Sequence, residues 1–307
     1  MSAKTVISGI LLLDKPQGIS SHSALAKAKF LFKSDSQDSK KAGHTGTLDP
    51  MATGLLPLVF GEATKFAQYG LDADKGYTAT IRLGAATDSG DADGQVIDHQ
   101  AVPSFDQAML DAIADAMTGA QSQIPPMYSA LKKDGKKLYE YARDGIEIER
   151  APRAITIHHL SLTKLGDDAI LLDVVCSKGA YVRVLGEDIA KRLGTVGHLT
   201  RLHRTMTGGF GVDDAITIDV LDALPMSERL ARLLPIDAML THLPTLMVSD
   251  DEAARLKLGQ RLNVKDRALS LAVFDETCLV RLYLGDEFIG LGEVASTGRL
   301  QPKKLVA

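Results

Sequence analysis

Short apolar runs separated by turn-forming residues dominate the first hundred residues of the chain. The runs GILLLDKP, LLPLVFG, YTATIRLGA and GQVIDHQ are bounded by Gly, Pro or Asp, which is typical of strands. Apolar residues recur at helical spacing in SSHSALAKAKFLFK (20–33) and SFDQAMLDAIADAMTG (104–119), and each segment opens on a serine that can cap a helix. Farther along, AITIHHLSLTKL and AILLDVVCSKGAYVRVL predict strands, and LGEDIAKRLG predicts a helix that ends at Gly194.

These elements mix without the regular strand–helix–strand alternation of a doubly wound sheet, so we expect an α+β fold with a mixed, largely antiparallel sheet. A length of 307 residues accommodates one large domain or two ordinary ones. We expect a first domain over 1–210 and a connecting region of short capped helices over 211–246. Residues 247–307 contain one helix and the strand-like runs LSLAVFD, CLVRLYLG and EFIGLGEVA, which predict a small β-barrel-like module.

The composition is that of a globular protein, with 45% hydrophobic and 24% charged residues. No apolar stretch reaches the ~20 residues of a membrane helix, and VISGILLL (6–13) lacks a cleavage site, so we expect a soluble cytoplasmic protein without a membrane partner. The two cysteines, Cys176 and Cys278, lie far apart, which argues against a disulfide framework or a thiolate zinc site and fits a reducing cytosol.

Positive charge is concentrated in two parts of a chain whose net charge is −4. Residues 1–65 carry 8 basic and 5 acidic side chains, and residues 116–210 carry 14 and 10, whereas residues 66–115 carry 2 and 9. A local positive surface can bind phosphates even on an acidic protein. Ordinary variation among solvated faces would give the same counts, so both interpretations stay open.

A lone carboxylate, Asp49, lies in the constrained loop AGHTGTLDPMATGLLPL (42–58). Asp-Pro is a common turn dipeptide, so a purely structural aspartate is one interpretation. The other is a nucleophile, because GHTGT surrounds the carboxylate with small residues and backbone amides. Tyr181 and Arg183 are two residues apart on a predicted strand and hence share one face. An arginine partner keeps a buried aspartate ionised and usable as a nucleophile.

Several other motifs fail on their spacing. GLLPLVFGEATK lacks the pattern of a P-loop, and in DSGDADGQVIDHQ a calcium hand would place Ser89 and Gln100 at its first and last ligand positions. An Asp/Gly turn between strands is the better interpretation of that loop. His158 and His159 are adjacent on a predicted strand and point to opposite faces. We therefore expect no metal site.

Five stretches resemble, in this order, the TruB family of bacterial tRNA pseudouridine-55 synthases: LLLDKPQGISSHSAL, KKAGHTGTLDPMATGLLPLVFGEATKFAQY, KGYTATIRLGAATDSGDADGQV, PPMYSALKKDGKKLYEYARDGIEI and CSKGAYVRVLGEDIAKRLG. The resemblance covers about residues 8–210 and continues towards the end of the chain. One departure is KGAYVR, where the family usually has a threonine before the tyrosine.

The resemblance implies that the protein isomerises the T-loop uridine at position 55 of tRNA to pseudouridine by base flipping, with Asp49 as the catalytic nucleophile. It implies substrate contacts for His44, Tyr77, Tyr181 and Leu202, and supporting roles for Arg183, as the partner of Asp49, and for Lys65. From the residues alone, Tyr77, Tyr181 and Leu202 would be assigned to the core. The reaction is redox-neutral and adds or loses no atom, so we expect no cofactor.

A basic insertion at about 121–153 interleaves cations with Tyr139 and Tyr141. Its candidate RNA-binding residues are Lys132, Lys133, Lys136, Lys137 and Arg143. Such interleaving suits phosphates and unstacked bases, although a solvated hairpin would look the same. By resemblance, the insertion grips the T-arm of tRNA, and the last ~60 residues are a PUA-type RNA-binding module that contacts the acceptor end. We expect a monomer without a required protein partner. A non-catalytic RNA-binding module and a relative that works only in a guide-RNA particle are the alternatives.

Overall fold

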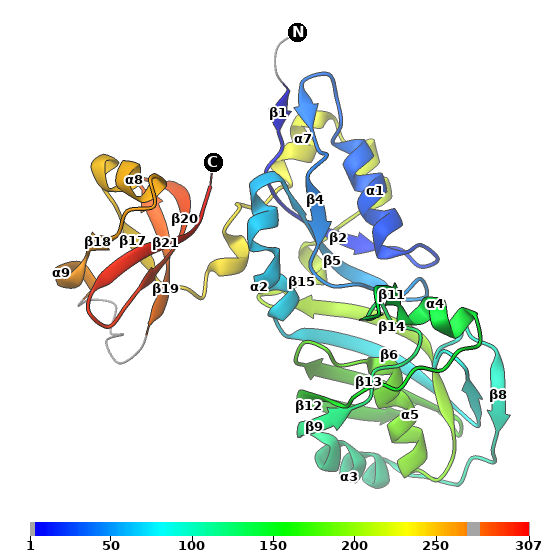
Figure 1. Cartoon of the computed structure of the whole chain (residues 1–307). Helices are drawn as coiled ribbons and strands as arrows, with labels where there is room; N and C mark the ends of the chain where they lie inside the picture. The colour runs from blue at the N-terminus through cyan, green and yellow to red at the C-terminus, as the bar shows by residue number, and fades with distance from the viewer. Residues whose placement is uncertain (1–3, 269–276, 307) are drawn as a thin grey trace.

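The computed structural model describes residues 4–268 and 277–306. Its main feature is a ten-stranded sheet, in which eight strands follow the order β16-β2-β5-β14-β6-β13-β12-β9, β15 pairs with β14 and β4 pairs with β5 (Figure 1). The strands are β2 (Gly9–Lys15), β4 (Ala42–His44), β5 (Thr53–Phe60), β6 (Lys75–Leu83), β9 (Gly119–Gln123), β12 (Arg153–Lys164), β13 (Ala169–Cys176), β14 (Gly197–Thr207), β15 (Phe210–Gly211) and β16 (Ile216–Thr217). Only the β14–β5 and β16–β2 pairs are parallel, so the predicted mixed, largely antiparallel sheet is confirmed.

The burial of the strands explains their sequence patterns. Along β13, buried and half-buried residues alternate, because one face packs on the core and the other does not. Along β5, every residue after Thr53 is buried, because both faces of this strand are covered. Leu56 and Leu58 face the main core, whereas Leu55 and Val59 pack against the segment around Leu234. The uninterrupted run LLPLVF is therefore that of a strand with two buried faces.

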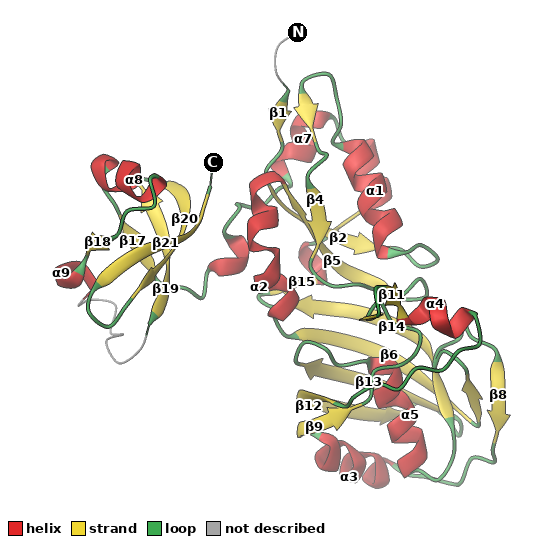
Figure 2. Ribbon diagram, in the orientation of Figure 1, coloured by secondary structure: helices red, strands yellow, loops and turns green. Residues whose placement is uncertain are grey.

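Three helices of eleven residues each support the sheet: α1 (Ser21–Leu31), α3 (Gln107–Met117) and α5 (Val182–Arg192) (Figure 2). Ser20 caps α1 as predicted, accepting from the backbone N–H of Ser23. The serine cap predicted for α3 is wrong. The cap is Asp106, whose carboxylate accepts from the N–H of Met109 at 2.9 Å, and the helix begins one residue later.

The segment after β13 differs from the prediction. A strand was expected to continue through Tyr181 and Arg183, but β13 ends at Cys176 and α5 begins at Val182. Gly179 adopts φ +83°, a conformation that interrupts the strand, and Tyr181 takes the N-cap position of the helix. The Gln123 side chain binds both the N–H and the C=O of Tyr181 and so fixes the start of the helix.

The remaining elements of the first 243 residues are short. They are β1 (Thr5–Val6), β3 (Gln37–Asp38), β7 (Ala85–Thr87), β8 (Val96–His99), β10 (Lys132–Lys133), β11 (Lys136–Lys137), α2 (Ala67–Asp72), α4 (Leu138–Arg143), α6 (Ile218–Ala223), α7 (Met226–Ala231) and the 3-10 helices η1 (Gly61–Phe66), η2 (Val212–Asp214) and η3 (Ala238–Leu240). The short helices predicted after Phe210 correspond to α6, α7 and η3. No helix among the described residues is long and apolar enough to cross a membrane.

The C-terminal module is a five-stranded sheet in the order β17-β19-β20-β21-β18 with its own apolar core. Its elements are β17 (Thr245–Met247), α8 (Asp250–Lys257), β18 (Leu262–Asn263), α9 (Lys265–Ala268), β19 (Cys278–Leu284), β20 (Glu287–Val294) and β21 (Arg299–Leu305). A capping box between Ser249 and Glu252 starts α8. The predicted strand LSLAVFD lies outside the described residues.

The module, coloured orange to red in Figure 1, joins the rest of the chain through a small interface at η1 and η3. The ring of Phe66 packs edge-on against that of Phe288, with centroids 5.4 Å apart. Asp237, which is buried just before η3, accepts from Arg281 at 3.0 Å and from the Tyr283 hydroxyl. These contacts combine apolar packing with a paired buried carboxylate.

Candidate active site

The loop that carries Asp49 is held on both sides by its neighbours. Ser21, at the start of α1, accepts from the N–H of Leu48 at 2.7 Å and donates to the C=O of Leu48 at 2.9 Å. The N–H of Gly18 donates to the C=O of Pro50 at 2.8 Å. The chain therefore fixes the backbone immediately before and after Asp49, while the Asp49 side chain stays 35% exposed.

Arg183 meets Asp49, as the resemblance implied, although it does so from the first turn of a helix and not from a strand. Its Nη2 lies 3.0 Å from Oδ2 of Asp49. The guanidinium is almost fully buried and also donates to the carbonyl oxygens of Ser89 at 2.6 Å and Tyr128 at 2.7 Å. Desolvation raises the pKa of Asp49 above its usual value, and the charge of Arg183 opposes that shift.

A second carboxylate shares this arginine, and the sequence did not reveal it. Asp91 is buried, and its Oδ2 lies 3.5 Å from Nε of Arg183. It comes from the DSGDADGQV loop, which was interpreted as an ordinary Asp/Gly turn. The turn is present, since Oδ1 of Asp91 accepts from the Ser89 hydroxyl and from the N–H of Asp93, but the carboxylate also reaches the site. Its negative charge adds to the rise in the pKa of Asp49.

Two fully buried cations lie beneath the Asp49 loop and were also missed. Lys15 donates to the carbonyl oxygens of Pro16 and Ile19 at 2.9 and 2.8 Å, and burial lowers its pKa to about 8 against the opposing charge of Asp49. Arg204 donates to the carbonyl oxygens of Leu55 at 2.6 Å and Gly46 at 3.2 Å. Neither cation pairs directly with a carboxylate in the described ranges, so backbone carbonyls replace their water.

The substrate-contact residues predicted from the resemblance occupy separate elements. Tyr77 lies on β6 opposite Arg204 of β14, and Leu202 lies two residues earlier on β14. Burial raises the phenol pKa of Tyr77 and of Tyr181, and the charge of Asp49 adds to both shifts. Of these predicted residues and Arg183, it is Arg183 that contacts Asp49 directly, at 3.0 Å.

His44 lies on β4, opposite Leu58 of β5. Burial lowers the pKa of His44, and the charges of Arg204 and His22 lower it further, which favours the neutral imidazole. Its Nδ1 is buried without a hydrogen-bond partner among the described residues. Strand β4 thus sets the position of the His44 ring.

Lys65 is not brought to Asp49. It lies on η1, where its ammonium donates to Glu62 at 2.5 Å and to the carbonyl of Leu305 at 2.8 Å. Leu305 belongs to β21, so Lys65 joins the first part of the chain to the C-terminal module. Lys65 therefore lies at the junction between η1 and the C-terminal module.

The basic insertion forms a small hairpin, β10–β11, followed by α4. Lys132 and Lys133 are exposed. Lys136 instead binds Asp144 at 2.5 Å and lies over the ring of Tyr141. Lys137 and Arg143 both lie over the ring of Tyr139, at 5.4 and 5.3 Å from its centroid. The predicted interleaving of cations and aromatic rings is therefore present as intramolecular cation–π contacts.

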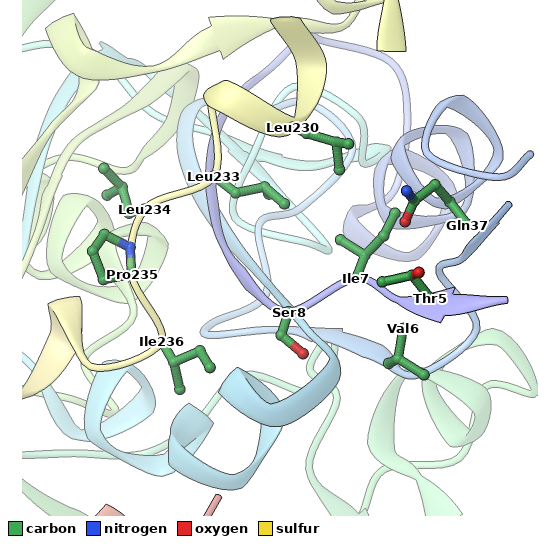
Figure 3. A pocket seen from close by; sticks show the side chains of 10 residues that line it. All are labelled: Thr5, Val6, Ile7, Ser8, Gln37, Leu230, Leu233, Leu234, Pro235 and Ile236. Carbon is green, nitrogen blue, oxygen red and sulfur yellow. The ribbon is translucent and has the colours of Figure 1, made fainter. Parts of the chain in front are cut away.

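A separate hollow of about 520 Å³ lies between the start of the chain and the segment that follows α7 (Figure 3). The side chains that line it are Thr5, Val6, Ile7, Ser8, Gln37, Leu230, Leu233, Leu234, Pro235 and Ile236. None of these ten residues is charged or titrates near neutral pH. Across the described parts of the chain, no group of three His, Cys, Asp or Glu side chains could hold a metal ion. The Asp49 cluster is the candidate for chemistry.

Comparison with known proteins identifies the class. Residues 34–182 match the model for the N-terminal domain of TruB family pseudouridylate synthases, and residues 244–306 match that for the TruB C-terminal domain of pseudouridine synthase II. The tRNA pseudouridine synthase B of Psychrobacter cryohalolentis is 50% identical, over 99% of this chain and 95% of its own. That of Aromatoleum aromaticum is 49% identical, over 99% and 94%.

Among solved structures, the chain resembles one titled "Crystal Structure of a Cbf5-Nop10-Gar1 Complex" with a TM-score of 0.69 and 23% identity, over 97% of this chain and 84% of that one. This likeness concerns the fold alone. Fold and sequence together define a pseudouridylate synthase, which is an isomerase. The chain belongs to the TruB family.

Proposed function

We propose that this protein converts the T-loop uridine at position 55 of tRNA to pseudouridine, with Asp49 as the nucleophile. The observation that carries the proposal is the Asp49–Arg183 ion pair, 3.0 Å long, on a loop fixed by α1. The names of the relatives, tRNA pseudouridine synthase B, support a tRNA substrate. The division into a catalytic domain (1–210), a connecting region (211–246) and a PUA-type module (247–307) is part of this proposal.

The chemistry needs one nucleophile and a pocket for an extruded base. The bond from the ribose C1′ to N1 of uracil breaks, the ring turns, and a bond from C1′ to C5 forms, while C5 loses a proton and N1 gains one. No atom or electron is gained or lost. A single ionised carboxylate meets this requirement when the base leaves the stack. Arg183 acts here by opposing the desolvation that would protonate Asp49.

The neighbouring side chains suit a flipped uracil. The aromatic ring of Tyr77 provides a stacking surface, and Tyr181 and Leu202 provide apolar walls. The ring of His44, on β4, would contact the RNA from which the base has left. In this proposal, Tyr77, Tyr181 and Leu202 hold the base against the Asp49 carboxylate.

The proposal assigns RNA binding to two regions outside the pocket. The exposed Lys132 and Lys133 of the basic insertion contact phosphates of the T-arm, together with Lys136, Lys137 and Arg143. The C-terminal module contacts the acceptor end. Because both RNA-binding regions belong to one chain, the proposal includes a monomer that acts in the cytoplasm without a protein partner. The likeness to the Cbf5-Nop10-Gar1 complex, at 23% identity, concerns the fold and assigns no protein partner to this chain.

Incubation of the purified protein with an unmodified tRNA transcript tests the proposal. We expect one pseudouridine, at position 55, when modified uridines are mapped. A protein that binds the transcript but leaves every uridine unmodified would be an RNA-binding relative and not an enzyme. Modification at another position would retain the isomerase and reject the T-loop assignment.

A further inference from the structure

Arg183 is held by two segments that are far apart in the sequence. One guanidinium nitrogen, Nη1, donates to the carbonyl of Ser89, and the other, Nη2, donates to the carbonyl of Tyr128 at 2.7 Å and lies 3.0 Å from Asp49. Ser89 belongs to the loop after β7, whereas Tyr128 belongs to the base of the basic insertion. The orientation of Arg183 towards Asp49 therefore depends on where both segments lie.

A side-chain hydrogen bond ties these two segments to each other. The hydroxyl of Tyr128 donates to Oδ2 of Asp88 at 3.1 Å. The other oxygen of Asp88 accepts from the N–H of Gln95 at 2.9 Å, which anchors Asp88 within its own loop. Tyr128 thus contacts the arginine through its carbonyl and the opposite segment through its hydroxyl.

The residues that follow Tyr128 support the basic hairpin. The N–H of Tyr139, in α4, donates to the carbonyl of Ser129 at 3.2 Å, and the N–H of Leu138 donates to the carbonyl of Leu131 at 2.8 Å. Leu138 is buried, so α4 is anchored at its first residue. A chain of hydrogen bonds consequently runs from α4 through residues 129–131 to the neighbourhood of Arg183.

We propose that Tyr128 is a positioning residue, which couples seating of the basic insertion to the geometry of the Asp49–Arg183 ion pair. RNA held by the insertion would favour the arrangement in which the Tyr128 carbonyl and the Ser89 carbonyl both orient the guanidinium. The inference rests on the proposed function, because it holds that RNA binding by the insertion changes the rate of the chemical step.

The electrostatics of Asp49 provide a specific readout. Burial raises the pKa of Asp49 and Arg183 opposes that shift, so a loosened Arg183 lets the pKa of Asp49 rise. The nucleophile must be ionised, and activity is lost as the pH falls through its pKa. The acid side of the rate–pH profile should therefore move to higher pH when Tyr128 no longer holds its place. A general loss of folded protein would lower the profile without moving it.

The test compares Tyr128→Phe with wild type on an unmodified tRNA transcript, measuring single-turnover rate at saturating enzyme, tRNA Kd and rate against pH. Tyr128→Phe keeps the ring and the backbone carbonyl and removes the hydroxyl bond to Asp88. We expect a rate about tenfold lower, in line with one lost hydrogen bond, a Kd within about twofold of wild type because phosphate contacts set affinity, and an acid limb at higher pH. Tyr69→Phe, the same change in α2, is the matched control and should match wild type in all three.

A double variant, Tyr128→Phe combined with Arg183→Lys, tests whether Tyr128 acts through Arg183. In Arg183→Lys the planar fork that reaches both carbonyls is gone, so adding Tyr128→Phe should lower the rate by less than twofold. An additive tenfold loss there, or a normal rate and pH profile for Tyr128→Phe alone, would overturn the role of Tyr128 while the wild-type enzyme remains active. An inactive wild type would instead overturn the proposed function, and this role with it.

Discussion

Arg183 and the lysines of the basic insertion carry the same charge in two different settings. Arg183 is buried, and four oxygen atoms from three parts of the chain surround its guanidinium. Lys132 and Lys133 are exposed on a two-residue strand. A buried cation with fixed partners can orient a reacting group, whereas an exposed lysine offers a mobile charge to a phosphate. The contrast implies that the rate of reaction depends on the buried cluster and the affinity for RNA on the exposed cations.

The largest expected effect is on the buried side of this comparison. Asp49→Asn keeps the shape of the side chain and removes its charge and nucleophilicity, so the single-turnover rate should fall by at least ~10³-fold. The tRNA Kd should be unchanged or slightly lower, because a carboxylate near RNA repels phosphates. Both are measured on one purified variant. Asp167→Asn, at an exposed turn, is the control. A rate within tenfold of wild type would leave Asp49 as a turn residue only.

The pH dependence of stability should distinguish a buried lysine, Lys15, from an exposed one. The pKa of Lys15 is lowered from 10.5 to about 8 by burial, so between these pH values the unfolded chain binds more protons than the folded one. Stability from this group is therefore least below pH 8 and rises towards pH 10.5. We expect the free energy of unfolding of the wild type, minus that of Lys15→Met, to rise by up to about 3 kcal/mol over that range.

Urea unfolding from pH 7 to 10.5 measures this difference, and taking it between variants cancels the tyrosines that also titrate there. Lys33→Met removes an exposed lysine beyond the end of α1 and controls for the loss of one charge. A difference that stays flat with pH for Lys15→Met would mean that Lys15 keeps its proton in the folded state. The carbonyl oxygens around it would then solvate the ammonium as well as water does.

The exposed side of the comparison predicts a change in affinity. Among the described residues, Lys132 and Lys133 make none of the ring and carboxylate contacts that engage Lys136 and Lys137, so we expect them to be the better phosphate partners. Replacing Lys132 and Lys133 by Ala should weaken tRNA binding by about tenfold near 0.1 M salt and flatten the salt dependence. The same change at Lys136 and Lys137 should do less, and the rate at saturation should stay near wild type. Equal slopes in all three proteins would place the insertion away from RNA.

The sequence predicted the parts of this molecule that short-range patterns determine. The apolar runs predicted strands, and the GHTGTLDP loop marked Asp49 as a candidate, whereas its pairing with Arg183 came from the family resemblance. Arg183 was nevertheless placed on a strand, because Tyr181 is not a usual capping residue and the turn depends on Gln123 from another strand. No local pattern marks such a long-range contact.

The buried charges were beyond sequence reasoning for a related reason. Lys15 ends an apolar strand and Arg204 lies in the mixed strand β14, and a charged residue at either place is normally taken to face solvent. Their partners are carbonyl oxygens of loops, which every sequence possesses. Asp91 was missed for a different reason. Its hydrogen bonds within the turn account for the residue locally, and its contact with Arg183 appears only in the folded chain.

Lys65 gives the smallest expected effect and separates two roles. The resemblance assigned it to support of catalysis, whereas in the structure it binds Glu62 on its own element, η1, and the carbonyl of Leu305 in the C-terminal module. If Lys65 acts at this junction, Lys65→Ala should weaken binding of full-length tRNA by about threefold, as expected for one partly exposed ionic contact. The rate on a minimal T-arm stem-loop, which is too short to reach the module, should not change. A fall in the stem-loop rate at saturating enzyme would restore the catalytic role, because only the pocket is engaged by that substrate. Stem-loop and full-length tRNA are therefore compared on the same preparation, with the salt concentration held constant.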